Sequence, residues 1–367
     1  MLLGGFQKID LDLLQLDVTE TDIKLMCDLH EIYNWKKYTN NGRTAGIYLF
    51  EHCGDFKEDD VILLPDYLCL TVILSVSLPK LKHKFYKVDR ELNIDIDDLR
   101  SKIDEKTKAI YIIHYFGFPQ RKEIIDELKN IRKEKKIELI EDITQTLFSR
   151  DKDCMGFGDY ILCSTRKWFP ITDGGLLAVR DGIKYEDIEL EDGYNEAAYK
   201  QLLISLMRDY FNKHPDKDKT FYIELEKEAN RDRYKDMTVR NMIPISKKIM
   251  LGCNMEEIIE KRRRNYTYLY QHLKDNENIQ IVSRELDNRG DYVPFGFLIL
   301  VENRNEFNEY LIEHNIIGEI QWILPEEYYV PGEDSSYLSK HNFMIHCDQR
   351  YSEEDMKYIV DTINSFF

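Results

Sequence analysis

Short apolar runs alternate with charged, amphipathic segments over the first half of the chain, and this alternation limits the fold more than any other feature. Runs suited to buried strands are VILLP (61–65), KAIYIIHYFG (108–117), IELIED (137–142), YILCS (160–164) and GGLLAVR (174–180). The segment RKEIIDELKNIRKEK (121–135), between two of them, has the apolar period of a helix. Strands that alternate with helices favour right-handed crossovers, so we predict a mostly parallel sheet up to about residue 182.

The other segments predict helices around this sheet and a second, smaller domain. Residues 20–52 have a helical pattern that includes the polar turn NNGR. Residues 183–240 are highly charged and rich in aromatic side chains, and they predict a helical insertion. Helix and strand alternate again after residue 250, and Ser352 with the acids that follow it is typical of a helix N-cap. We therefore expect a large domain over residues 1–245 and a small α+β domain over residues 246–367.

Composition and charge exclude several classes of protein. The net charge of −17 argues against a protein that binds the phosphate backbone of a nucleic acid. No segment approaches the ~18 consecutive apolar residues of a membrane span, and the first residues lack the basic region of a signal peptide. The 7 cysteines are scattered without a CxxC pair, which favours reduced thiols in the cytoplasm and indicates no metal site.

Two charged positions lie where consecutive apolar runs end. The acids Glu141 and Asp142 close IELIED, and Lys167 follows YILCS. Ligands of parallel sheets lie at the carboxyl ends of the strands. A lysine and a carboxylate there can hold pyridoxal phosphate (PLP), since the lysine forms a Schiff base and the acid keeps the pyridine nitrogen protonated. Taken singly, Lys167 could be a surface charge, and Asp142 could cap the turn ITQT.

An ordered series of motifs extends through nearly the whole chain. These are GRTAGIYLF, VILLPDYLCLTV, LNIDIDDL, KTKAIYIIHYFGFP, ELIEDITQ, FGDYILCS, DGGLLAV, RRRNYTYLYQHL and DQRYSEEDM. In these motifs and their order the chain resembles the DegT/DnrJ/StrS family of PLP-dependent aminotransferases. The resemblance implies fold type I, in which a three-layer α/β/α PLP-binding domain with a mostly parallel sheet carries a smaller C-terminal α+β domain.

The resemblance also implies roles for individual residues. Lys167 matches the Schiff-base lysine, Asp142 the acid that pairs with the pyridine nitrogen, and Gln145 the glutamine near the ring hydroxyl. On the phosphate side, the match is to Ser164 and to the turn of Gly42, Arg43 and Thr44. Gly42 would let the backbone approach the phosphate, and the helix that follows offers unbonded N–H groups. Less specific candidates are Tyr67, Cys69 or Tyr115 as ring-stacking groups, His114, Trp322 and Arg350, and Arg166 or the basic run Lys261–Arg264 as contacts of an anion.

The chain also departs from the family pattern. The spacing from Ser164 to Lys167 is about two residues shorter than usual, and Trp168 stands where an asparagine is common. Thr146 and Leu147 replace the usual His-Gly. The segment YKDMTVRNMIPIS (234–246) lies where the family has a loop that donates an asparagine across the dimer.

The activity that the resemblance implies is transamination. An amino group would pass from glutamate to a nucleotide-linked keto sugar, in surface-polysaccharide or antibiotic-sugar synthesis, and the protein would be a homodimer. Two alternatives remain open. One is a PLP enzyme of the same fold that acts on a non-sugar amine or keto acid. The other is a non-catalytic relative, against which the retained Asp142 and Lys167 argue.

Overall fold

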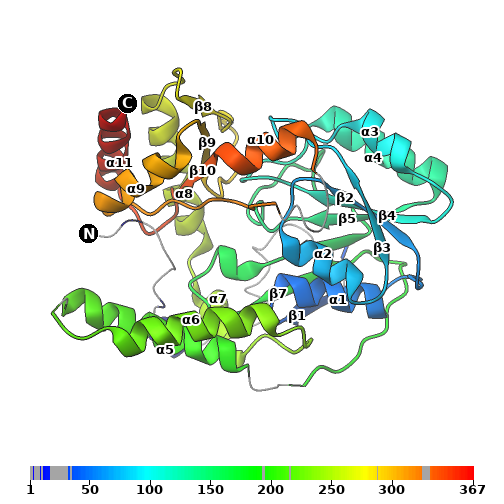
Figure 1. Cartoon of the computed structure of the whole chain (residues 1–367). Helices are drawn as coiled ribbons and strands as arrows, with labels where there is room; N and C mark the ends of the chain where they lie inside the picture. Colours follow the sequence, from blue (N-terminus) through cyan, green and yellow to red (C-terminus); the bar gives the residue numbers. More distant parts are fainter. Residues whose placement is uncertain are drawn as a thin grey trace.

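The computed structural model describes residues 3, 9, 11–16, 32–33, 35–191, 195–214, 216–286, 288–324 and 331–367. Its larger part is a seven-stranded sheet with the strand order β1-β7-β6-β5-β4-β2-β3 (Figure 1). The strands are β1 (Trp35–Thr39), β2 (Val61–Pro65), β3 (Lys82–Tyr86), β4 (Thr107–Ile113), β5 (Glu138–Asp142), β6 (Tyr160–Cys163) and β7 (Gly175–Val179).

The sheet is mostly parallel, as predicted, and mixed at one edge. The strands β6, β5, β4, β2 and β3 run parallel to one another, whereas β7 is antiparallel to both β6 and β1. The helical pattern expected over residues 20–52 is wrong at Trp35–Thr39, because these residues pair with β7 as an edge strand. Residues 20–31 lie outside the described part of the chain.

Helices cover both faces of the sheet. Figure 1 shows α1 (Gly42–His52) and α2 (Leu70–Ser77) on one face, and α3 (Ile96–Lys102) and α4 (Lys122–Lys135) on the other. The apolar stripe of α4, formed by Ile125, Leu128 and Ile131, is buried. The chain direction across the sheet reverses between β2 and β4, and such a reversal opens a crevice at the carboxyl ends of the strands.

The insertion forms a helical hairpin. After an extended stretch that follows β7, α5 (Glu196–Lys213) and α6 (Thr220–Lys235) pack against each other around Ile204, Leu225 and Ala229. The hairpin projects from the lower part of the molecule in Figure 1. A short helix, α7 (Pro244–Gly252), then returns the chain to the main core, where Ile249 and Met250 are buried.

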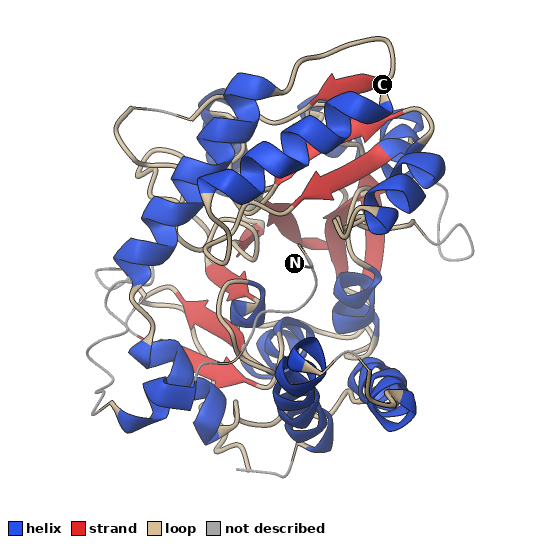
Figure 2. Cartoon of the chain, turned by 90° about the vertical axis from the view of Figure 1, so that its left-hand side faces the viewer, coloured by secondary structure: helices blue, strands red, loops and turns tan. Residues whose placement is uncertain are grey.

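The second part of the chain has its own core and its own sheet. Its elements are α8 (Met255–His272), β8 (Ile279–Ile281), β9 (Phe297–Val301), α9 (Arg304–Glu313), α10 (Glu333–His341), β10 (Asn342–Ile345) and α11 (Glu353–Phe366). The three strands form an antiparallel sheet with the order β10-β9-β8, and with its helices this sheet occupies the upper part of Figures 1 and 2.

The helix cap predicted at Ser352 is confirmed, since the Ser352 hydroxyl accepts a hydrogen bond from the Asp355 N–H group. The domain boundary between residues 245 and 246 stays a prediction.

Candidate active site

The turn before α1 presents two unbonded backbone N–H groups. Asn41 caps the helix, with its side chain accepting from the Thr44 N–H group at 3.0 Å, and the Thr44 hydroxyl accepts from the Asn41 N–H group at 3.1 Å. Among the described residues, the N–H groups of Gly42 and Arg43 have no such partner, as expected for the first turn of a helix. Thr44 is therefore part of the helix cap.

Close contacts fix this turn against the sheet. The Gly174 N–H group donates to the Asn40 carbonyl at 2.8 Å, and a Cβ atom on Gly175 would collide with the Asn41 carbonyl. A Cβ atom on Gly42 would lie 3.1 Å from the Ser164 Cβ. The glycines of NNGR and DGG thus let the start of α1 approach β7 and Ser164.

Asp142 lies at the carboxyl end of β5 and is almost buried, with an 8% exposed surface. One carboxylate oxygen accepts from the Tyr111 hydroxyl at 2.7 Å, and the other accepts from the Thr144 N–H group at 2.8 Å. Burial, reinforced by the Asp142 charge, raises the pKa of Tyr111 well above its usual value, so the phenol remains a donor. Asp142 thus bonds the turn that follows, and its oxygens still have lone pairs for a further donor.

Glu141 points away from this site, because successive side chains of a strand face opposite sides. Its carboxylate accepts from the backbone N–H groups of residues 156–158. The His114 Nε2 lies 3.1 Å from the same carboxylate, and its Nδ1 accepts from the Gln120 N–H group. His114 therefore carries its proton on Nε2 and supports the fold.

Gln145 has an amide group that is only half bonded. Its Oε1 accepts from the Phe116 N–H group at 2.8 Å, whereas its Nε2 is buried without a partner among the described residues. An unsatisfied buried donor costs about 1–3 kcal/mol. This position thus suits an acceptor on a bound molecule.

Lys167 reaches between the two parts of the chain. It ends a 3₁₀ turn, Thr165–Lys167, that begins directly after Ser164. Its Nζ lies 5.6 Å from the ring centre of Phe295 and 6.0 Å from that of Trp322. The next residue, Trp168, is buried, and its indole N–H group donates to the Thr144 carbonyl at 2.8 Å. The tryptophan that departs from the family pattern thus anchors the turn that carries the lysine.

These residues surround one cavity of about 740 Å³, within the ~300–1,000 Å³ range of ligand pockets. It lies at the carboxyl ends of β4, β5 and β6, and Met344 of β10 in the second sheet also lines it. Of the predicted site residues, Gly42, Arg43, Asp142, Gln145, Ser164 and Lys167 line it, and Thr44 does not. Cys69, Arg166, Trp322 and Arg350 also line it, whereas Tyr67, Tyr115 and His114 do not.

Several lining residues carried no signal in the sequence. Tyr111 lies inside a strand pattern, and Arg233 is one of many charges in the insertion. Gln321 resembles Gln145, since its Nε2 is also buried and has no partner in the described part of the chain. His346 and Asp348 come from the segment after β10.

Arg43 joins the helix start to the insertion. Its guanidinium donates to the carbonyl groups of Arg233, Tyr234 and Asp236 at 2.9, 3.2 and 2.7 Å. These carbonyls belong to the carboxyl end of α6 and to its C-cap residue. The side chain of Arg43 thus fixes the insertion beside the cavity, and burial lowers its pKa.

The basic run Lys261–Arg264 serves the fold. Arg262 is 1% exposed, lies 4.4 Å above the ring of Trp168, and donates to Gln349 and to the carbonyl groups of Pro294 and Phe295. The two arginines that follow also donate to backbone carbonyl groups. Arg263 donates to the carbonyl of Tyr292, and Arg264 donates to the carbonyl of Tyr351.

Arg350 is also engaged. It forms a bidentate ion pair with Asp348, at 2.8 and 2.7 Å. Burial alone would raise the pKa of Asp348, but the Arg350 guanidinium overcomes it and holds that pKa well below its usual range. This pair gives the wall formed by the second domain a fixed charge pattern.

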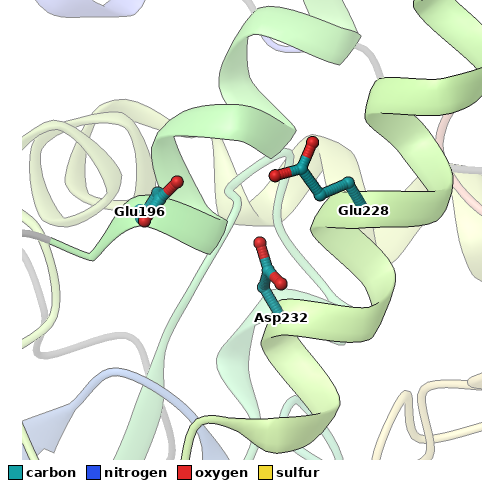
Figure 3. A group of neighbouring side chains, drawn as sticks. All are labelled: Glu196, Glu228 and Asp232. Atoms are coloured by element: carbon teal, nitrogen blue, oxygen red, sulfur yellow. The ribbon is translucent and has the colours of Figure 1, made fainter.

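The described residues contain one group of acids with the spacing of metal ligands, namely Glu196, Glu228 and Asp232 of the hairpin (Figure 3). The Lys200 ammonium binds all three carboxylates, at 2.7, 2.6 and 2.8 Å. The cluster is thus a salt-bridge network around a lysine. In the part of the chain that the structure describes, no helix is long and apolar enough to cross a membrane.

Comparison with protein families matches residues 37–203 to the DegT/DnrJ/EryC1/StrS aminotransferase family. A GDP-4-keto-6-deoxy-D-mannose 3-dehydratase of Yersinia pseudotuberculosis is 30% identical over 127 residues, which are 32% of each protein. A dTDP-4-dehydro-2,3,6-trideoxy-D-glucose 4-aminotransferase of Saccharopolyspora spinosa is 26% identical over 170 residues, 43% of each protein. The matched segments thus span less than half of these curated relatives.

Solved structures share the whole fold. The sugar aminotransferase CalS13 from Micromonospora echinospora superposes with a TM-score of 0.69 at 15% identity and covers 100% of both chains. Helicobacter pylori PseC, an aminotransferase of pseudaminic acid biosynthesis, gives 0.68 at 15% identity, covering 100% of this chain and 98% of that one. A GDP-4-keto-6-deoxymannose-3-dehydratase with a trapped PLP-glutamate geminal diamine gives 0.66 at 20% identity, covering 97% and 93%. They confirm the predicted fold, and the last of these three proteins is the one that holds PLP.

Proposed function

Because the chain belongs, through residues 37–203, to the DegT/DnrJ/EryC1/StrS aminotransferase family, we propose that it is a PLP-dependent aminotransferase. The observation that carries this proposal is the convergence of Gly42, Asp142, Gln145 and Lys167 on one cavity of about 740 Å³. These residues come from three separate elements and from the turn after β5, and their donors and acceptors differ in kind.

The donor set fits the cofactor. The Gly42 and Arg43 N–H groups and the Ser164 hydroxyl would hold its phosphate, since the start of a helix favours an anion. The unpartnered Gln145 amide would donate to the ring hydroxyl, and Asp142 would accept from the pyridine nitrogen. Lys167 would carry the covalent link. Among the three ring-stacking candidates, only Cys69 lines the cavity.

The protein's own groups then divide the work of amino transfer. When bound, PLP supplies an electron-accepting ring. The Asp142 carboxylate would hold the proton on the pyridine nitrogen, and Tyr111 and the Thr144 N–H group keep the carboxylate in place. The Lys167 Nζ would accept a proton from the amine-bearing carbon and return it, as a general acid and base.

The substrate that we favour is a nucleotide-linked keto sugar, with glutamate as amino donor, in surface-polysaccharide or related sugar biosynthesis. Two observations support it. The relatives named above act on GDP- and dTDP-linked sugars according to their names. The lining of the cavity also includes polar groups of Glu319, Gln321 and Arg350, which suit a hydroxyl-rich molecule.

A dehydratase is the second candidate, because the relative with 30% identity carries that name. A half-reaction assay separates the candidates. The protein is loaded as the pyridoxamine form and offered keto sugars linked to UDP, GDP or dTDP, beside simple 2-keto acids. An amino sugar as product supports the proposal, and a deoxy keto sugar supports the dehydratase. A response to keto acids alone assigns the non-sugar alternative.

The proposal includes a homodimer in the cytoplasm. The 6 cysteines of the described residues are thiols outside any disulfide, which suits a reducing compartment. One face of α5 exposes Tyr199, Leu203, Leu206 and Tyr210 at helical spacing, as an interface would. Light scattering of the holoprotein should give twice the chain mass of 43.9 kDa, and a fully active monomer would refute the dimer.

A further inference from the structure

Two arginines from distant parts of the chain meet at the cavity. Arg166 lies in the 3₁₀ turn between Ser164 and Lys167, and Arg233 lies near the end of α6 in the insertion. Both line the cavity of about 740 Å³, and both also line a smaller cavity of about 40 Å³ beside it. They therefore form a shared wall between the cofactor side of the site and the hairpin.

Arg166 has no protein partner in the described chain. No hydrogen bond or ion pair joins its guanidinium to a described residue, although the side chain is largely enclosed. Burial, and next the like charge of Arg233, lower the pKa of Arg166 to about 9. The carboxylates of Glu319 and Asp173 raise the pKa of Arg166, yet neither lies within ion-pair distance of its guanidinium. Arg233 donates to the Asn230 side chain at 3.2 Å. An anion between Arg166 and Arg233 would relieve the repulsion of their like charges.

The hairpin is held in this position from the cofactor side. The Arg43 guanidinium donates to the carbonyl groups of Arg233 and Tyr234, while the backbone N–H group of Arg43, at the start of α1, bonds to no described residue. The charge of Arg233 is thus fixed close to the helix end that already favours an anion. All these groups attract the same kind of ligand.

We propose that Arg166 and Arg233 form an anion subsite for a phosphate group, completed within one chain by the α5–α6 hairpin. Guanidinium groups bind phosphate oxygens through paired, charge-assisted hydrogen bonds. The phosphate can come from PLP or from the diphosphate of a nucleotide-linked substrate. The inference deepens the proposed function. It rests on that function only where it identifies PLP and a nucleotide-linked substrate as the sources of the phosphate.

The test measures binding by calorimetry. Apoprotein is titrated with inorganic phosphate, PLP and pyridoxal, and PLP-loaded protein is titrated with UDP. The variants are Arg166→Gln and Arg233→Gln, and the control is Arg231→Gln, because Arg231 lies on the same helix but is 61% exposed. Loss of a charge-assisted bond worth ~1.5–3 kcal/mol should weaken phosphate binding by about 10- to 100-fold in the variants and leave the control unchanged.

The two sources give different results. If PLP binding falls and pyridoxal binding does not, the subsite holds the cofactor phosphate. If PLP binding is unchanged and UDP binding falls, it holds the substrate diphosphate. Unchanged affinity for phosphate, PLP and UDP in both variants would overturn the proposal.

Stability supplies an independent readout. Removing one of two neighbouring like charges should leave the melting temperature of the apoprotein unchanged or raise it. A fall in melting temperature with unaltered anion affinity would mean that the arginines only support the fold. Failure of the proposed function would be recognised separately, because these titrations need no turnover. Absence of a cofactor label on Lys167 would refute the proposed PLP-dependent activity and leave the phosphate-binding result unaffected.

Discussion

The Tyr111 hydroxyl donates a 2.7 Å hydrogen bond to the Asp142 carboxylate, and both side chains line the cavity. Tyr111 lies on β4 and Asp142 on the neighbouring strand β5, so the pair is fixed by the sheet itself. Because the phenol stays protonated, it remains the donor of this bond. The pair thus fixes the orientation of the Asp142 carboxylate at the edge of the sheet.

Asp142→Asn should keep the cofactor link to Lys167 but lose most of the turnover. An amide cannot hold the protonated pyridine nitrogen by charge, so the electron-accepting ring is weakened. We expect kcat to fall by about 100-fold or more, as for other lost electrostatic contacts. Steady-state transamination and the absorbance of the bound cofactor measure the two effects. A rate close to that of the parent would mean that Asp142 only bonds its turn.

The matched control is Glu141→Gln, one residue earlier on the same strand. Glu141 is fully buried and accepts three backbone N–H groups on the face away from the cavity. We expect a loss of stability of about 2 kcal/mol, because buried donors lose a charged acceptor. Urea unfolding measures it, and turnover per folded molecule should change far less than in Asp142→Asn.

Lys167 should carry the cofactor. Borohydride reduction of the holoprotein, followed by peptide mapping, should place a pyridoxyl mass on the peptide that contains Lys167. We expect this label because the Lys167 Nζ lies near the rings of Phe295 and Trp322 at the cavity, and because Trp168 anchors the turn that carries the lysine. A label on another lysine, or none after PLP is added, would refute the assignment.

The strand ends of the candidate site could be predicted from the sequence because their signals are local. The apolar runs before Asp142 and Lys167 end abruptly, and parallel strands bring such ends together at one edge. The turns NNGR and DGG were visible as glycine-containing motifs, although only the structure shows Gly174 and Gly175 packed against Asn40 and Asn41.

Features that depend on long-range pairing could not be predicted. Trp35–Thr39 forms a strand only because β7 offers it an edge. Arg43 was matched through its backbone, whereas its side chain binds carbonyl groups about 190 residues later. Arg233 lies among many charges of the insertion, and nothing in its neighbours distinguishes it. Arg262 is buried although its run resembles a solvated helix face.

Asp173 should make stability depend on pH. It is 3% exposed, its carboxylate accepts from the Ile243 N–H group at 2.9 Å, and burial raises its pKa to about 6. The native state then holds its proton more tightly than the unfolded state, so its contribution is complete below about pH 4 and is lost as pH rises through 6. The shift corresponds to about 3 kcal/mol at most.

The measurement for Asp173 is urea unfolding from pH 4 to pH 7. The parent should lose stability over this range relative to Asp173→Asn, which keeps a similar shape and cannot ionise. Equal slopes in the two proteins would show that Asp173 titrates at its ordinary pKa in the folded state.

Gly175→Ala should damage the phosphate side of the site more than the rest of the fold. The new Cβ atom would collide with the Asn41 carbonyl, so the turn before α1 must shift, and Gly42 and Arg43 must shift with it. We expect PLP affinity to fall by about tenfold and stability by about 1–3 kcal/mol, the usual cost of overpacking. Gly182→Ala is the control. An alanine at its φ of 86° would be strained, but no atom of the described residues lies within 4 Å of the new Cβ. Fluorescence titration with PLP should therefore distinguish the two variants, and equal PLP affinities would mean that the turn before α1 does not hold the phosphate.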